Sequence, residues 1–202
     1  MDLDELLAGV HACRICADAA KPLPHAPRPV LQPGRQARIL IAGQAPGVRV
    51  HASGKPFTDP SGVRLRAWLG VAEATFYDPR QVAILPMGFC FPGLDAKGSD
   101  LPPRPECSPA WRAPLMAEMP EIELVVCLGA YAMRWHMRDA WPGSVDAAVK
   151  TWRAGLKLTP PVIALPHPSW RNSGWLKRNP WFAAELVPEL RTRVARLLGP
   201  PA

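Results

Sequence analysis

The chain has 202 residues, 48% of them hydrophobic, which is enough for a sizeable core, and we expect a single domain over residues 1–202. No apolar run approaches the roughly 20 residues of a membrane-spanning helix. The acidic, amphipathic first residues do not resemble a signal peptide, so we expect a cytoplasmic protein without a membrane partner. The formal net charge of +7 favours nucleic acid as an anionic partner, although arginine used for solubility would give the same charge.

The N-terminal stretch combines a short helix with a cysteine pair. Aliphatic residues at helical spacing in residues 2–10 predict an amphipathic helix, and Cys13 and Cys16 follow directly. A C-x2-C pair on a turn lets two thiolates converge on one metal, but redox and zinc sites share this spacing. Five cysteines in a cytoplasmic protein favour metal or redox chemistry over disulfide bonds. Prolines in residues 21–36 then predict an extended surface loop.

Strand and helix patterns alternate along the rest of the chain. Short apolar, β-branched runs predict four buried strands, at residues 38–42, 81–87, 123–129 and 162–165. Helical patterns follow the first three strands, and a last helix follows the fourth. This alternation predicts a three-layer α/β/α fold with a central, mainly parallel, four-stranded sheet.

Three helix boundaries have local sequence signals. Asp59 can cap a helix whose first position is Pro60, and Ser108 followed by a proline repeats the device. The last helix is expected to begin at Asn179, and Pro188 should kink or split it.

Glycine and proline end the first strand abruptly, in GQAPG at residues 43–47. In an open α/β sheet, ligands bind just outside the carboxyl ends of the strands. We therefore expect the active cleft at this turn, with His167 joining it from the end of the fourth strand.

The motifs resemble those of a known family. GQAPG at 43–47, GKPF at 54–57 and HPSWRN at 167–172, together with four cysteines in the matching order, resemble the uracil-DNA glycosylase superfamily. The resemblance is closest to its iron–sulfur branches, families four and five. It implies a uracil-DNA glycosylase-like fold and a monofunctional DNA glycosylase. Such an enzyme hydrolyses the N-glycosidic bond of uracil, or of a related deaminated or damaged base, and initiates base excision repair. We expect it to act as a monomer.

The same resemblance implies a cofactor. In families four and five, four cysteines in this order hold a [4Fe–4S] cluster, and the matching positions are Cys13, Cys16, Cys90 and Cys107. Zinc is the alternative, since four thiolates also suit it, and free or paired thiols are the third possibility. A cluster would be structural, because cleaving an N-glycosidic bond transfers no electron. Cys127 lies in an apolar strand and is expected to be a buried hydrophobic residue.

The resemblance implies four candidate catalytic residues. His167 would donate a hydrogen bond to the uracil carbonyl as charge develops there. Gln44 would orient water, and Asp59 is a second water-positioning candidate, although a helix N-cap explains it better. His51 lies in the first motif loop and would touch water or phosphate, or simply be a solvated histidine.

Further residues are candidates for binding the base and the DNA. Phe57 would stack on an extruded base, unless it is a core residue, with Gly43 and Ala45 lining the pocket and Asn172 supporting it. Two kinds of residue are candidates for contacting DNA. One is a wedge that fills the hole left by the base, and the other is a set of basic residues that contact phosphates, unless these charges only form a solvated loop. Together the candidates are Ser169, Trp170, Arg171, Lys177 and Arg178.

The sequence departs from the family pattern at three places. Residues 85–88, at the end of the second strand, lack the asparagine with which family four reads the uracil edge, so the preferred lesion stays open. Ala45 stands where family one carries an activating aspartate. Lys55 replaces an arginine, and no lyase nucleophile is evident. The rival interpretation is a non-catalytic, metal-cluster-containing protein that binds damaged DNA on the same fold; a metal-dependent nucleotide hydrolase and a covalent DNA trap through His51 are more distant.

Overall fold

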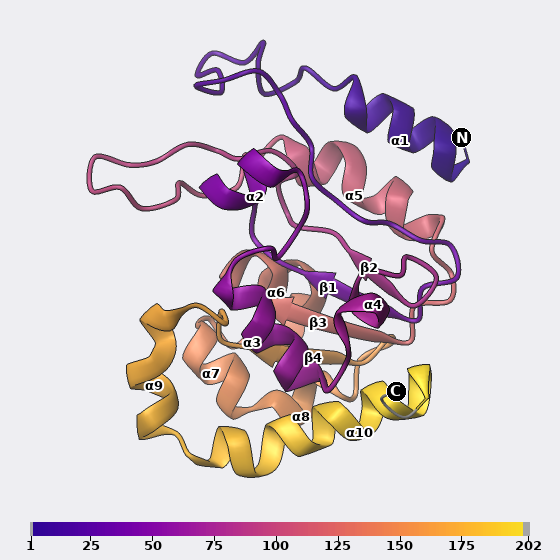
Figure 1. The fold of residues 1–202 in the computed structure, drawn as a ribbon, viewed down its shortest axis with the longest axis vertical. Helices are drawn as coiled ribbons and strands as arrows, with labels where there is room; N and C mark the ends of the chain where they lie inside the picture. The colour runs from indigo at the N-terminus through magenta and orange to yellow at the C-terminus, as the bar shows by residue number, and fades with distance from the viewer. Residues whose placement is uncertain (1, 200–202) are drawn as a thin grey trace.

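The computed structural model describes residues 2–199 and is built around one parallel sheet (Figure 1). Its strands are β1 (Ile39–Ala42), β2 (Val82–Ile84), β3 (Leu124–Leu128) and β4 (Val162–Leu165). Their order is β2-β1-β3-β4, and every pairing is parallel. All strand residues are buried, as expected when helices cover both faces of a parallel sheet. The predicted fold class is confirmed.

The helices before β3 are α1 (Leu3–His11), α2 (Val48–Ser53), α3 (Pro60–Leu69), α4 (Glu73–Phe76) and α5 (Cys107–Ala117). α3 begins as predicted, with Asp59 as its N-cap and Pro60 in the first turn. α5 does not, because its N-cap is Glu106 and the helix starts before Ser108. The Ser108 hydroxyl instead donates to the Met87 carbonyl oxygen at 2.5 Å, so its partner lies in a distant segment rather than in its own helix.

The helical segments after β3 are α6 (Ala130–Met137), η1 (Arg138–Ala140), α7 (Val145–Lys150), α8 (Trp152–Gly155), η2 (Trp170–Asn172), α9 (Ser173–Arg178), η3 (Phe182–Leu186) and α10 (Val187–Leu198). The helix expected from Asn179 consists of the π-helical turn η3 followed by α10. Pro188 has no N–H to continue an α-helical ladder across this point. The Val187 N–H bonds to the carbonyl of Phe182, five residues back, and α10 begins there, so the proline splits the helix as predicted.

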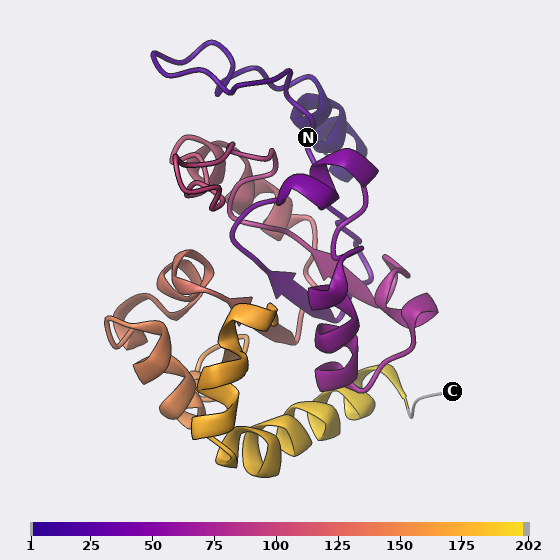
Figure 2. The same cartoon turned by 60° about the vertical axis from the view of Figure 1, so that its left-hand side comes forward.

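Helices lie on both sides of the sheet, with α3 on one side of the strands and α6 and α7 on the other (Figure 2). α6, α7 and α8 contact β3 or β4, α3 contacts α10, and α1 contacts α5. One hydrophobic core extends from α1 through all four strands to α10. None of the helices described is long and apolar enough to cross a membrane.

Candidate active site

The carboxyl ends of three strands surround a cavity of about 100 Å³. Residues after β1, β2 and β4 line it, together with side chains from the loops beside them, among them Gly43, Gln44, Ala45, Phe57, Asp59, Pro86, Asp100 and His167. The cavity adjoins an open groove of about 670 Å³, with which it shares several lining residues, Gln44, Asp59, Ser61, Asp100 and His167. The turn predicted to form the cleft and the histidine after β4 therefore meet, as the topology requires.

His167 is half-buried just beyond β4, and a nearby backbone N–H sets its tautomer. The Ser169 N–H donates to His167 Nδ1 at 3.3 Å. A neutral imidazole that accepts at Nδ1 carries its proton on Nε2. Burial lowers the pKa of His167, while the Asp59 and Asp100 carboxylates raise it. The ring can therefore act as a neutral Nε2–H donor.

Two other side chains fix the loop that carries His167. The Asn172 amide donates to the His167 carbonyl oxygen at 2.7 Å. Arg64 on α3 donates to the Ser169 carbonyl oxygen at 3.0 Å. Asn172 thus stabilises the histidine backbone, and Arg64 is a supporting residue that sequence reasoning missed.

Phe57 forms an aromatic wall of the cavity and is held in an unusual backbone conformation. Its φ is 54°, in the left-handed region, and its ring packs edge-to-face against Phe76 with 5.9 Å between centroids. The Tyr77 hydroxyl bonds the Pro56 and Phe57 carbonyl oxygens, at 2.8 and 3.1 Å. Such strain persists only where the surroundings enforce it, and here they fix the ring at the cavity.

Asp59 and Gln44 lie where both cavities meet. Asp59 Oδ1 accepts bonds from the Ser61 N–H at 3.0 Å, the Gly62 N–H at 3.3 Å and the Ser61 hydroxyl, so the carboxylate caps α3 as well as lining the cavity. The Gln44 side chain packs against Gly129, whose φ is +88°. A Cβ added to Gly129 would lie only 2.7 Å from Gln44 Nε2. A glycine at this helix start lets the amide lie against the backbone.

The structure adds a carboxylate that the sequence did not single out. Asp100, from the long loop between β2 and α5, lines both cavities, and a Cβ on Gly47 would lie 3.2 Å from its Oδ2. Burial raises the pKa of Asp100, partly offset by Arg171 and His167. Its only sequence signal was a place in a loop that leaves a strand end. Ser61 and Arg49, which also line the groove, were missed as well.

The proposed wedge lies at the groove. Trp170 is 76% exposed in η2, and it lines the groove together with Ser169 and Arg171. Lys177 and Arg178 are exposed on α9, outside the residues that line the groove.

His51 and Lys55 lie apart from the cavity walls. His51 packs on His25 with 4.2 Å between ring centroids and also contacts Phe91, and burial lowers its pKa. Lys55 Nζ lies 3.7 Å from the Tyr77 ring centroid and 3.7 Å from Glu73 Oε1. Neither residue is among those that line the cavity or the groove.

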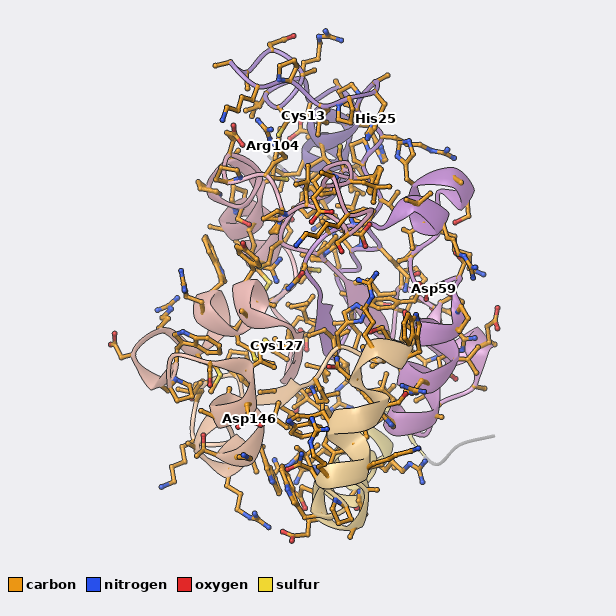
Figure 3. All side chains as sticks on the ribbon, turned by 90° about the vertical axis from the view of Figure 1, so that its left-hand side faces the viewer. Cys13, His25, Asp59, Arg104, Cys127 and Asp146 are labelled. Carbon is orange, nitrogen blue, oxygen red and sulfur yellow. The ribbon has the colours of Figure 1, made fainter. Side chains whose placement is uncertain are left out.

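The four cysteines line a separate small cavity of about 20 Å³. Figure 3 places Cys13 and Arg104 together at one end of the molecule, away from Asp59 and from Cys127, which is fully buried in β3. The Trp111 indole N–H donates to Cys13 Sγ at 3.3 Å, and the Phe89 N–H donates to Cys107 Sγ at 3.4 Å. Burial raises the pKa of Cys90 to about 11 and that of Cys107 to about 12.

Four thiols in one cavity, with N–H groups directed at the sulfurs, fit a soft metal or an iron–sulfur cluster. Within residues 2–199, no three His, Cys, Asp or Glu side chains are arranged to hold a metal ion. The cluster and zinc therefore both stay predictions.

One segment connects the two cavities. Pro86 lines the strand-end cavity, and Gly88, Phe89 and Cys90 line the cysteine cavity. The N–H groups of Met87 and Gly88 donate to the carbonyls of Gly43 and Gln44, at 2.9 and 2.8 Å. The backbone of the first motif is thus tied to the chain that leads to Cys90.

A parallel sheet with a cavity at its carboxyl edge is the arrangement of α/β proteins that bind ligands beyond the strand ends. The family model of the Uracil DNA glycosylase superfamily matches residues 30–191, and the chain belongs to this superfamily. The predicted family is confirmed. Membership supports a DNA glycosylase type of function with DNA as the partner. The iron–sulfur branch and the choice of uracil stay predictions.

Proposed function

We propose that the protein is a monofunctional DNA glycosylase that excises uracil, or a related deaminated or damaged base, by hydrolysing its N-glycosidic bond. The observation that carries this proposal is the Ser169 N–H on His167 Nδ1, which leaves Nε2–H as the donor at a cavity walled by Phe57. Extruded bases are typically held between flat apolar surfaces and polar groups.

His167 would stabilise the leaving base. As the glycosidic bond breaks, negative charge develops on a base carbonyl, and a preorganised donor to such an oxyanion contributes about 3–4 kcal/mol. Because burial lowers its pKa, the imidazole acts as a neutral donor. Asn172 and Arg64 keep this donor in place through the loop backbone.

Asp100 is the strongest candidate for positioning and deprotonating the attacking water. It supplies a carboxylate in a cavity where Ala45 cannot, and a general base works best when its pKa approaches the working pH, which burial favours here. Gln44 lines the same cavity and would be a neutral partner for the same water. Asp59 is held by the α3 cap, so it contributes mainly charge beside the sugar cation.

DNA handling would fall to the groove. Exposed Trp170 would fill the space left by the extruded base, and Arg171, Lys177 and Arg178 would contact phosphates. Pro86 stands at the strand end where a uracil-reading side chain is expected, so the base edge would be read by backbone groups.

Cys13, Cys16, Cys90 and Cys107 would hold a [4Fe–4S] cluster that serves as a structural crosslink, joining the N-terminal segment to residues 90–107. The support for this is their shared cavity and the N–H groups that face two of the sulfurs. We also propose that the enzyme acts as a cytoplasmic monomer.

Base release from matched oligonucleotides tests the function. The panel carries uracil opposite guanine, uracil opposite adenine, single-stranded uracil, hypoxanthine, or thymine opposite guanine. Release by the wild type and by the exposed-histidine control His11→Ala, but not by His167→Ala, is the expected result. No release from any substrate, with salt-sensitive DNA binding intact, would overturn the glycosylase and favour the non-catalytic DNA-binding protein.

A further inference from the structure

A third cavity, of about 520 Å³, lies outside the site described above, between the start of α5 and the outer face of α6. Its walls combine prolines 103, 105 and 109 with side chains of α6 and η1. We call it the α6 groove and define it by Tyr131, Arg134, Trp135 and Arg138. α5 and α6 lie near one another on one side of the molecule (Figure 2).

Two aromatic rings of the α6 groove are exposed to solvent. Tyr131 is 42% exposed and Trp135 is 37% exposed. The two residues are four positions apart on α6, so they share one face of the helix. Large rings side by side on a surface are typical of sites that stack on planar ligands.

The arginines of the groove are also available. Arg134 and Arg138 are exposed, and within residues 2–199 no hydrogen bond or ion pair holds either guanidinium. Arg138 has φ 47° and ψ −119°, a conformation that favours glycine. A strained, unpaired arginine beside two exposed rings has no structural partner that explains it, which favours a functional role.

The α6 groove lies next to the candidate active site. Pro86 lines the strand-end cavity, and the next residue, Met87, lines the groove. Gly129, just before α6, packs against the Gln44 side chain. The end of β2 and the start of α6 thus border both sites.

We propose that the α6 groove binds single-stranded DNA, with unpaired bases stacked on Tyr131 and Trp135 and phosphates paired with Arg134 and Arg138. Exposed rings require free base faces, which a duplex does not offer because its bases are already stacked. The unpaired arginines supply the charge complementarity for a phosphate backbone. The inference rests on the proposed function only in taking DNA as the nucleic acid, since binding in the groove requires no damaged base.

Fluorescence anisotropy with an undamaged oligodeoxythymidine of about 12 nucleotides, a length that such grooves cover, tests the proposal. Tyr131→Ala should weaken binding at least about fivefold, while Tyr131→Phe, which keeps the ring, should bind like the wild type. Arg134→Ala should reduce the slope of log affinity against log salt by about 0.7, the value of one single-strand phosphate contact.

Arg196→Ala removes another exposed helical arginine, from α10, and is the matched control for charge. Arg138→Gly is the control for folding, because glycine suits the positive φ, so it should weaken binding without lowering the melting temperature.

Equal affinity of Tyr131→Ala, Tyr131→Phe and wild type would overturn the proposal, as would equal effects of Arg134→Ala and Arg196→Ala. A dimer that Tyr131→Ala disrupts would assign the groove to a second copy of the chain instead. Because the probe carries no lesion, loss of base release and loss of groove binding are read separately.

Discussion

At the scale of single residues, the candidate site depends on two side chains, His167 and Asp100, and burial shifts their pKa values in opposite directions. Burial lowers the pKa of His167, keeping it a neutral donor, and raises the pKa of Asp100, bringing a carboxylate closer to the range of a useful base. Catalytic pairs typically lie in environments that shift the pKa values of the two groups apart, so that each group takes a different role.

Asp100→Asn tests the carboxylate while preserving its size. We expect kcat to fall at least about 100-fold with little change in KM, because a general base contributes about that much or more. Since burial raises the pKa of Asp100, wild-type activity should fall with decreasing pH earlier than an ordinary aspartate predicts. The variant should lose this acid limb. Single-turnover base release from pH 4 upward measures both effects.

Asp4→Asn is the control, because Asp4 is exposed on α1, far from the cavity. An Asp100→Asn enzyme with unchanged kcat and the same pH profile would show that another group positions the water.

Local signals at single residues were predictive only where the partner is local too. Asp59 and Pro60 predicted the start of α3, because a cap bonds to the next turn of its own helix. Ser108 had the same pattern, but its hydroxyl bonds to Met87, a contact that exists only in the folded chain. Asp100 was missed for the same reason, since only the fold brings it over Gly47.

At the scale of elements, a hydrogen-bonded arginine–histidine pair joins α5, α6 and the end of β2. Arg112 is fully buried, and its Nη1 donates to the carbonyl oxygens of Leu85 and Pro86, both at 3.1 Å. Its Nη2 lies 2.6 Å from His136 Nε2. An arginine has no acceptor, so His136 accepts at Nε2 and must be neutral. The pair thereby fixes the strand end that forms one wall of the cavity.

This pair predicts a pH-dependent stability. Burial, reinforced by the charges of Arg112 and Arg138, lowers the pKa of His136 to about 3 from 6.5. Between these values the unfolded chain binds a proton that the folded protein excludes. The free energy of unfolding should therefore fall, by up to about 1.4 kcal/mol per pH unit, as the pH decreases below 6.5.

Urea unfolding at several pH values, for the wild type and His136→Gln, measures the effect. Glutamine keeps an acceptor for Arg112 but does not titrate, so the variant should show a smaller loss of stability toward low pH. The exposed-residue control His11→Gln should behave like the wild type. Parallel pH profiles for wild type and His136→Gln would contradict a neutral His136 in the folded protein.

At the scale of the whole molecule, the sheet and the place of the cleft followed from sequence, because strand alternation and the carboxyl-edge rule depend on order along the chain alone. α2 was not predicted. It is short, has no buried residue and no side-chain cap, and contains two valines that disfavour a helix. His51 was grouped with the catalytic residues from its motif position, but on α2 it faces His25 and Phe91 instead.

The cysteine cavity brings residues 13–16 together with residues 90–107. Cys13, Cys16 and Cys90 lie in segments without regular secondary structure, and Cys107 is the first residue of α5, so a bound cluster should contribute directly to folding. We expect protein isolated without oxygen to contain iron and acid-labile sulfide. Cys90→Ser should lose both and melt at a lower temperature, because the N-terminal segment is then no longer crosslinked.

The fifth cysteine provides the control. Cys127 is fully buried in β3, outside the cysteine cavity, so Cys127→Ala should keep its iron while losing packing and a weak S–H bond to the Ala132 carbonyl oxygen. If the wild type contains zinc instead of iron, the four cysteines are still the metal site, but the metal is zinc. Equal metal content in Cys90→Ser and wild type would exclude this cavity as the metal site. Because Met87 and Gly88 tie the same segment to Gly43 and Gln44, loss of the cluster should also weaken base release, even though no electron passes through it.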